Sequence, residues 1–200
     1  MKHVRNIIKI AAILSLLSVE LYALYAVLHP RVSPEYRAFF IDRSTVEWNP
    51  PRYHASPEQG IDFMREGWPD FVSGVYGFSS FEPWGRWSDA NLLASPRIVL
   101  NRQFSGSLCI EMVAQPAYTE YGKQVQVAFG QNISDITLSD SDFATYSLNF
   151  PDASPADTLE FHFPNKIARL NDVVRASADA RRLGIRLRSL RILPHQCSAK

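Results

Sequence analysis

The chain has 200 residues, of which 46% are hydrophobic and 20% are charged. This length and composition fit one globular domain with a short additional segment and exclude a large multidomain enzyme. The formal net charge is only +1, so an attraction of the whole molecule to nucleic acid is not expected.

An almost uninterrupted apolar run covers residues 7–29, where 18 of 23 residues are hydrophobic. As a helix it would extend for about 34 Å, enough to cross a hydrocarbon core of about 30 Å. The run is longer than the apolar region of a usual signal peptide, and residues 22–27 (YALYAV) contain no clean small-x-small cleavage site. We therefore expect one uncleaved transmembrane helix over residues 7–29.

The charges around this run predict its orientation. Three basic residues, Lys2, Arg5 and Lys9, stand at its N-terminal side, and no comparable basic cluster follows it. By the positive-inside rule, residues 1–6 are cytoplasmic and the rest of the chain is exported. In a bacterium this predicts a single-pass inner-membrane protein with a periplasmic C-terminal domain.

Glu20 is the one carboxylate inside the apolar run. It lies about 16 Å along the helix from Lys9, so the two side chains cannot pair within one helix. Ionisable groups inside a bilayer are costly, so Glu20 is either tolerated in its neutral form or faces a polar group of a partner protein. Glu20 is thus the candidate contact with a membrane partner.

The exported part divides into a tether and a body. Residues 30–60 contain five prolines and no sustained period, which predicts a Pro-rich tether. Residues 61–200 show short runs in which apolar and polar residues alternate, typical of antiparallel strands. The runs lie at residues 98–101, 108–113, 124–130, 146–150, 159–163 and 185–192.

These runs predict an all-β fold with seven or eight strands, arranged as an antiparallel, jelly-roll-like β-sandwich. The last run changes parity between Leu187 and Leu190, which predicts a β-bulge there. Residues 171–182 are the one stretch of the body with room for a short helix.

Charge is segregated within the exported part. Residues 30–164 have a net charge of −8, whereas residues 165–191 have a net charge of +6. The basic segment either contacts an anionic glycan, lipid headgroup or acidic partner, or forms a solvated edge that discourages sheet pairing.

The two cysteines are Cys109, in a predicted strand, and Cys197, near the C-terminus. Export permits a disulfide between them, which would tie the tail to the sandwich. The alternative is a buried free Cys109 beside a mobile tail cysteine.

Catalytic motifs are weak or absent in the sequence. The five histidines lack metal-ligand spacing, and there is no CxxC, no HExxH and no phosphate-binding glycine loop, so neither a metal nor a cofactor is expected. Residues 77–81 (GFSSF) lack the last glycine of a nucleophile elbow. The sequence therefore assigns no catalytic residue and favours a protein that is not an enzyme.

The most unusual composition lies in residues 67–92, which hold three of the four tryptophans, with Arg86 between Trp84 and Trp87. Flat aromatic faces beside charged groups suit sugar rings, which stack on the aromatics while their hydroxyls meet the charges. The alternative is structural: the indoles pack under the sandwich while Arg86 binds Glu82 or a backbone carbonyl.

Residues 77–92 (GFSSFEPWGRWSDANL) resemble the motif that opens the C-terminal β-sandwich domain of phosphoglycerol transferase I, which decorates osmoregulated periplasmic glucans. Related domains occur on membrane proteins of bacterial polysaccharide assembly. Residues 156–159 (ADTL) and 181–185 (RRLGI) extend the resemblance, which covers about residues 70–193. Catalysis in that family belongs to a separate sulfatase-like domain, so the resemblance implies the accessory sandwich and transfers no catalytic residue.

The leading hypothesis is a membrane-anchored, non-catalytic periplasmic accessory protein that binds an envelope glycan or polysaccharide. Its candidate contacts are Glu82, Trp84, Arg86, Trp87, Arg181 and Arg182. The second hypothesis is a structural subunit that docks on a membrane glycosyltransferase or phosphoglycerol transferase through Glu20. The third is a small transferase or hydrolase acting on glycan, for which Glu82, Ser88 and Asp89 are the first residues to test.

Overall fold

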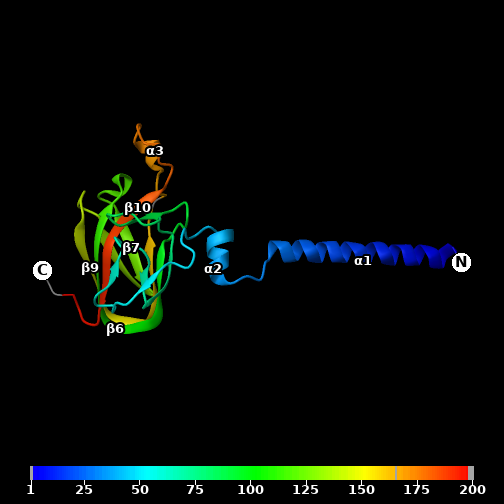
Figure 1. Ribbon diagram of the computed structural model, residues 1–200, viewed down its shortest axis with the longest axis horizontal. Coiled ribbons are helices and arrows are strands. Elements are labelled where there is room, and N and C mark those ends of the chain that lie inside the picture. The colour runs from blue at the N-terminus through cyan, green and yellow to red at the C-terminus, as the bar shows by residue number, and fades with distance from the viewer. Residues whose placement is uncertain (1, 165, 198–200) are drawn as a thin grey trace. The chain divides into compact units, whose positions relative to one another are not determined.

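The computed structural model describes residues 2–164 and 166–197 (Figure 1). The chain divides into two compact units, Met1–Arg37 and Ala38–Lys200. The first unit contains the long helix α1 (Lys2–Leu28) and the single-turn helix α2 (Pro34–Tyr36), which Ser33 caps.

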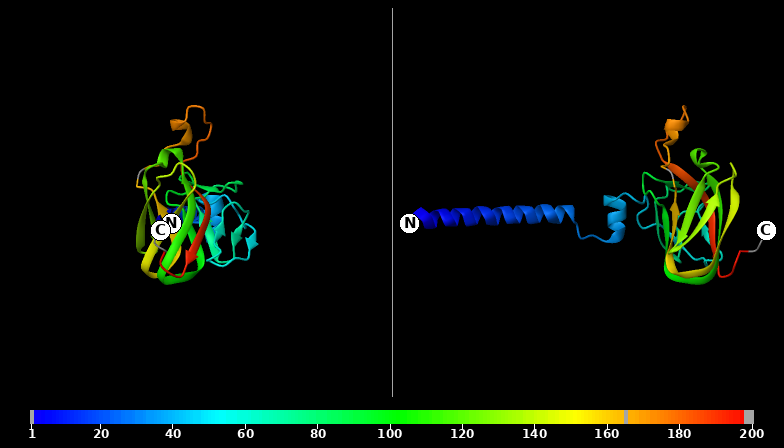
Figure 2. Two further views of the ribbon diagram at one scale, coloured as in Figure 1. Left: turned by 90° about the vertical axis from the view of Figure 1, so that its left-hand side faces the viewer. Right: turned by 180° about the vertical axis from the view of Figure 1, so that it is seen from behind.

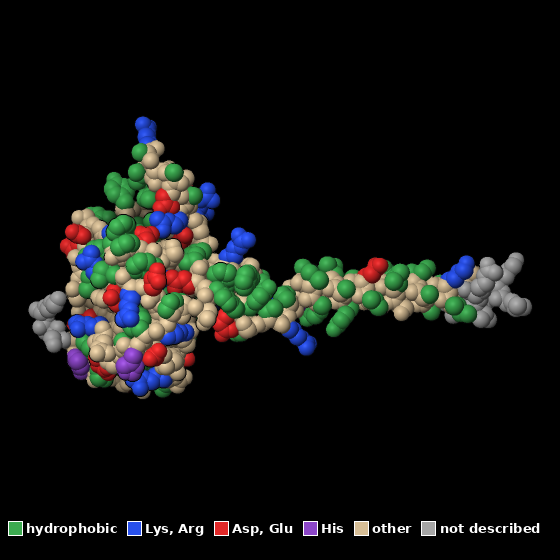
Figure 3. Space-filling model, in the orientation of Figure 1, with side chains coloured by type: hydrophobic (Ala, Val, Ile, Leu, Met, Phe, Trp, Pro, Cys, Tyr) green, Lys and Arg blue, Asp and Glu red, His purple; other side chains and the backbone are tan. Residues whose placement is uncertain are grey.

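Helix α1 contains all but the last residue of the span expected over residues 7–29. Its segment Ile8–Leu28 has a mean hydropathy of 2.0, and none of it is buried. The visible face of the helix is covered largely by hydrophobic side chains (Figure 3). By length and composition this helix can cross a membrane, which is compatible with a single-pass membrane protein.

The second unit is a sandwich-like body of mostly antiparallel strands, as the alternating runs predicted. The π-helical turn η1 (Arg37–Ile41) includes the last residue of the first unit and the first four of the second. The strands of the second unit are β1 (Arg52–Tyr53), β2 (Ile61–Asp62), β3 (Trp68–Pro69), β4 (Val72–Tyr76), β5 (Arg86–Asp89), β6 (Arg97–Pro116), β7 (Gln124–Phe129), β8 (Asn132–Thr137), β9 (Ala144–His162) and β10 (Leu183–Leu193). The 3₁₀ turn η2 (Tyr118–Glu120) follows β6, and the short helix α3 (Leu170–Val173) precedes β10.

Strands β6 and β9 are long enough to belong to both layers of the sandwich. The first part of β6 pairs with β4 and with the end of β9, whereas its last part pairs with β10 and with the start of β9. Register shifts between Val99 and Leu108 mark the bend, where Gly106 has φ +81°. The bend lies at the lower end of the body in Figure 1, and Figure 2 shows it from two further sides.

The two layers enclose one connected hydrophobic cluster. Alternate residues of each strand point into it, so Val125, Val127 and Phe129 of β7 are all fully buried. Phe161 of β9 meets Phe78 edge-on, with ring centroids 6.1 Å apart. Burial of such large side chains from both layers is what holds the sandwich closed.

Two local predictions are confirmed by the structure. The register of β10 against β6 shifts between Leu187 and Ser189, at the predicted bulge. Helix α3 begins one residue before the stretch in which a short helix was expected.

Part of the expected tether lies within the body. Ser44 is buried and its carbonyl accepts from Gly77 N at 2.6 Å, and Pro51 O accepts from Trp68 N at 2.9 Å. Strand β1 pairs in parallel with β3. The prolines of this stretch thus fit short irregular connections that hydrogen-bond to the body, and not only a loose linker.

Candidate functional site

The site is built on a row of three side chains across neighbouring strands. The register of β5, β10 and β6 places Trp87, Arg186 and Gln115 side by side. All three are half-buried on the outer face of this layer, because the alternate residues Ile185 and Leu187 point into the core.

Contacts within the row fix its geometry. The Arg186 guanidinium lies over the Trp87 ring, 4.8 Å from its centroid. Arg186 Nη2 donates to Gln115 Oε1, and Gln115 Nε2 donates to Ser141 O at 2.8 Å. Burial lowers the pKa of Arg186, although a guanidinium remains charged at any physiological pH.

Turn η2 adds two tyrosines to this row. Tyr118 is 76% exposed and Tyr121 is 55% exposed. The turn is held from both sides, since Ala117 N donates to Gly184 O and Gly122 N donates to Leu138 O, each at 2.8 Å. The tyrosines are therefore displayed at the surface by a fixed backbone.

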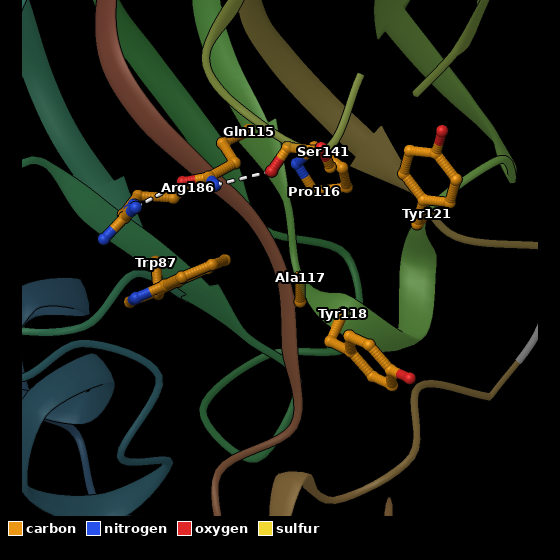
Figure 4. Close-up of a pocket in the computed structure, with 8 residues that line it drawn as sticks. All are labelled: Trp87, Gln115, Pro116, Ala117, Tyr118, Tyr121, Ser141 and Arg186. Atoms are coloured by element: carbon orange, nitrogen blue, oxygen red, sulfur yellow. Dashed lines mark hydrogen bonds between the residues drawn. The ribbon is translucent and has the colours of Figure 1, made fainter. Parts of the chain in front are cut away.

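Together these residues line a pocket of about 580 Å³, which we call the Trp87 pocket. Its lining consists of Trp87, Gln115, Pro116, Ala117, Tyr118, Tyr121, Ser141 and Arg186. Figure 4 shows Trp87 and Arg186 on one side and the two tyrosines on the other, with Gln115 and Ser141 between them. Aromatic rings beside amide, hydroxyl and guanidinium groups can stack on a sugar ring and hydrogen-bond to its hydroxyls.

Arg86 is one of the predicted contacts that do not line this pocket. Its side chain is 1% exposed and its Nη1 donates to a Glu47 carboxylate oxygen. The guanidinium also lies 4.2 Å from the centroid of the Trp68 ring. The structure therefore directs Arg86 into the body, as in the structural alternative, with Glu47 rather than Glu82 as its carboxylate.

Glu82, Trp84 and Arg181 form a second group, which we call the Trp84 cluster. Trp84 is 51% exposed and its Nε1 donates to Glu82 Oε2 at 2.8 Å, while Arg181 Nη1 donates to Glu82 Oε1 at 3.0 Å. Arg181 also pairs with Asp179 at 2.7 Å. The hydrogen bond from Arg181 lowers the pKa of Asp179. The hydrogen bonds that Arg181 makes to Asp179 and Glu82 raise the pKa of Arg181 in turn.

The last of the predicted contacts, Arg182, supports the backbone. Its amide donates to Asp89 Oδ1 at 3.1 Å, and its Nη1 donates to the carbonyl of Ile167. It thereby connects the start of β10 to the end of β5 and to the segment before α3.

The side chains considered for catalysis have structural partners. Ser88 is fully buried and its Oγ accepts from Ile185 N at 2.9 Å. Asp89 is 5% exposed and its Oδ1 accepts from two backbone amides, Asn91 N and Arg182 N. Within residues 2–164 and 166–197 there is no group of three or more His, Cys, Asp or Glu side chains that could hold a metal ion.

Another polar chain lies at the end of β9. Ser95 Oγ is 3.2 Å from His162 Nδ1, and His162 Nε2 is 3.3 Å from Glu160 Oε2. The residue types are those of a serine–histidine–carboxylate triad, but the two imidazole nitrogens are exchanged relative to it. These residues do not line the Trp87 pocket.

The remaining two predicted sites are also placed. Glu20 lies on α1 with its side chain exposed. Cys109 and Cys197 form a disulfide with their Cα atoms 4.9 Å apart, so the pairing that the sequence left open is present in the structure.

Sequence reasoning missed the seven pocket residues that lie outside residues 67–92, namely Gln115, Pro116, Ala117, Tyr118, Tyr121, Ser141 and Arg186. One signal was available: Tyr118 and Tyr121 stand in a polar stretch where no strand period would bury them. The sequence could not predict that these residues line one pocket, because they come from segments up to about a hundred residues apart.

Comparisons with known proteins found both solved structures and a curated relative. Two solved variants of a family 29 carbohydrate-binding module each match 68% of this chain and 89% of their own, with 15% identity and a TM-score of 0.42. Phosphoglycerol transferase I of Escherichia fergusonii is 26% identical over 156 residues, which are 78% of this chain. The match spans only 20% of that enzyme's length.

A family model also matches residues 45–194, which are most of the chain and almost the whole sandwich. The matched range includes every residue of the Trp87 pocket. The chain therefore belongs to the DUF7024 family, a domain of unknown function.

Proposed function

We propose that this protein is a membrane-anchored, non-catalytic accessory protein that binds an envelope glycan through the Trp87 pocket. One observation supports the proposal most directly: three exposed or half-buried aromatic rings, those of Trp87, Tyr118 and Tyr121, line the same pocket as Arg186 and Gln115. The pocket has a volume of about 580 Å³. A pocket of this size and lining accommodates one or two sugar rings.

The match to phosphoglycerol transferase I supports a role connected with glycan. We infer that the shared part is a C-terminal accessory sandwich of that enzyme, since it spans a fifth of the enzyme's length. The burial of Ser88 and Asp89 supports a non-catalytic role for both, because a substrate would not reach either side chain.

We further propose that α1 crosses the bacterial inner membrane, with residues 1–6 cytoplasmic and the sandwich periplasmic. Basic residues at the N-terminal end of the span support this orientation. The Cys109–Cys197 disulfide also supports it, because such bonds persist in oxidising compartments.

Trp87→Ala is expected to weaken glycan binding about tenfold or more, the loss typical of a central aromatic contact. The full chain, reconstituted in nanodiscs, would be titrated by calorimetry with β-1,2-, β-1,3- and β-1,4-linked glucose hexasaccharides. Tyr118→Ala removes a second ring of the pocket and is expected to weaken binding as well.

Trp84→Ala is the matched control, because Trp84 is exposed and lies outside the pocket. We expect it to bind like the natural protein. A loss with Trp84→Ala but not with Trp87→Ala would move the site to the Trp84 cluster. If none of these neutral glucans binds the natural protein, binding of neutral glucan through the Trp87 pocket is refuted.

A second candidate function is docking on a membrane enzyme, favoured by the carboxylate of Glu20 within the long apolar part of α1. Glu20→Leu is then expected to abolish crosslinking to a stoichiometric membrane partner in cells, because it removes a polar contact that the bilayer makes costly to leave unpaired. Glu20→Gln, which can still hydrogen-bond, is expected to keep the crosslink. Equal crosslinking by all three proteins would argue against docking through Glu20.

A further inference from the structure

Two arginines of β10 have no ion-pair partner among the described residues. Arg186 and Arg188 both lie on the half-buried outer face of the strand. Their guanidinium groups share one aromatic ring, that of Phe143, at 4.8 Å and 3.8 Å from its centroid. Arg186 also covers Trp87 in the pocket. Two like charges are therefore held close together beside the Trp87 pocket.

Neither guanidinium has a carboxylate within 4.0 Å among the described residues, and the Nε atom of each is buried without a hydrogen-bond partner there. Other arginines nearby are neutralised. Arg191 of the same strand pairs with Glu111 at 2.5 Å, and Arg181 pairs with both Glu82 and Asp179.

Partly buried charges without a partner are costly, and the cost is recovered when an anion binds. Guanidinium groups suit carboxylates and phosphoryl groups in particular, because their planar N–H fork matches two acceptor oxygens. An aromatic surface next to such a fork recognises a ring and an anionic substituent together.

Building on the proposed glycan binding, we propose that the Trp87 pocket selects a sugar carrying a negative charge, either a carboxylate or a phosphoryl ester. The sugar ring stacks on the aromatic rings, Arg186 contacts the anionic group, and Arg188 adds positive charge from the next outward position. The second amide hydrogen of Gln115 and the hydroxyl group of Ser141 remain for the hydroxyl groups of the sugar.

The test compares matched ligands on the full chain in nanodiscs of zwitterionic lipid, so that anionic headgroups do not compete. Each of the three glucose hexasaccharides is titrated in its neutral form, with its 6-positions oxidised to carboxylates, and with a 6-phosphoryl group. We expect one or both acidic forms to bind about tenfold or more tightly than the neutral form, and we expect added salt to reduce that preference.

Arg186→Gln is expected to remove the preference for the acidic forms while leaving weaker stacking of the neutral sugar. Arg191→Gln removes one positive charge from the same strand outside the pocket, and is expected to keep the preference. If Arg186→Gln fails to fold, Arg188→Gln and the salt dependence of the natural protein provide the same comparison.

The outcomes separate this inference from the proposed function. Equal binding of neutral and acidic sugars overturns the charge selection and leaves glycan binding intact. Binding of none of the sugars overturns both. Whichever acidic form binds more tightly identifies the anionic group, carboxylate or phosphoryl ester, that the pocket selects.

Discussion

Replacing Arg86 with alanine is expected to lower the free energy of unfolding of the sandwich by about 3–5 kcal/mol. The reason is the environment of its side chain, which is 1% exposed and paired with Glu47. Alanine would leave that carboxylate without its counter-charge, in a site where one of its oxygens, Oε2, is buried without another partner among the described residues. It would also remove the contact with the Trp68 ring and the hydrogen bond to Arg65 O at 3.3 Å.

Chemical denaturation followed by tryptophan fluorescence measures this loss, because all four tryptophans belong to the second unit. Arg191→Ala is the control: it removes a half-exposed arginine from an ion pair with Glu111, and exposed pairs contribute at most about 1 kcal/mol. Arg86→Lys is expected to fall between the two, since lysine keeps the charge but lacks the planar fork. If Arg86→Ala costs no more than Arg191→Ala, the buried pair is not what stabilises this part of the body.

Arg86 also shows what a sequence motif can and cannot predict. Its position between two tryptophans indicated a special site but left two uses open, ligand binding and internal pairing. The deciding residue was Glu47, which lies 39 positions earlier in a stretch expected to be a tether. Nothing local in the chain joins the two residues, so only the folded structure could distinguish the two uses.

The strands likewise differ in how far the local sequence could predict them. Alternation located the β7 run and the bulge of β10, because side-chain burial with a period of two is a local property. It split β6 and β9 into separate strands, because most of their central residues are exposed at the bend and break the alternation there. The short strands β4 and β5 were missed for a related reason, since four or five residues give too few alternations to recognise.

Of the Trp87 pocket, the sequence analysis predicted Trp87 and no other member. Trp87 stood out by composition, whereas Arg186 was one of eight basic residues in its segment and had no feature that set it apart. Its role depends on the antiparallel register with Gln115 and Trp87. Register is determined by packing across strands, which one sequence does not display.

The second large effect is expected from the disulfide. Cys109→Ala combined with Cys197→Ala is expected to lower the free energy of unfolding by about 4 kcal/mol, because the bond closes a loop with a sequence separation of 88 and restricts the unfolded chain. This corresponds to a fall in melting temperature of about 10 °C for a body of this size. Alanine is preferred to serine because Cys109 is fully buried, where a hydroxyl group would add its own cost.

Thermal melting of the full chain with and without a thiol reductant distinguishes the bond from other effects of the substitutions. The natural protein should lose stability on reduction, whereas the double variant should melt at the same temperature in both conditions. The same bond reports on the compartment, because an exported sandwich should resist alkylation in intact cells until a reductant is added. A natural protein that is alkylated without reduction would argue against a periplasmic sandwich. If the melting temperature of the natural protein is the same with and without reductant, attaching the tail to β6 does not stabilise the fold.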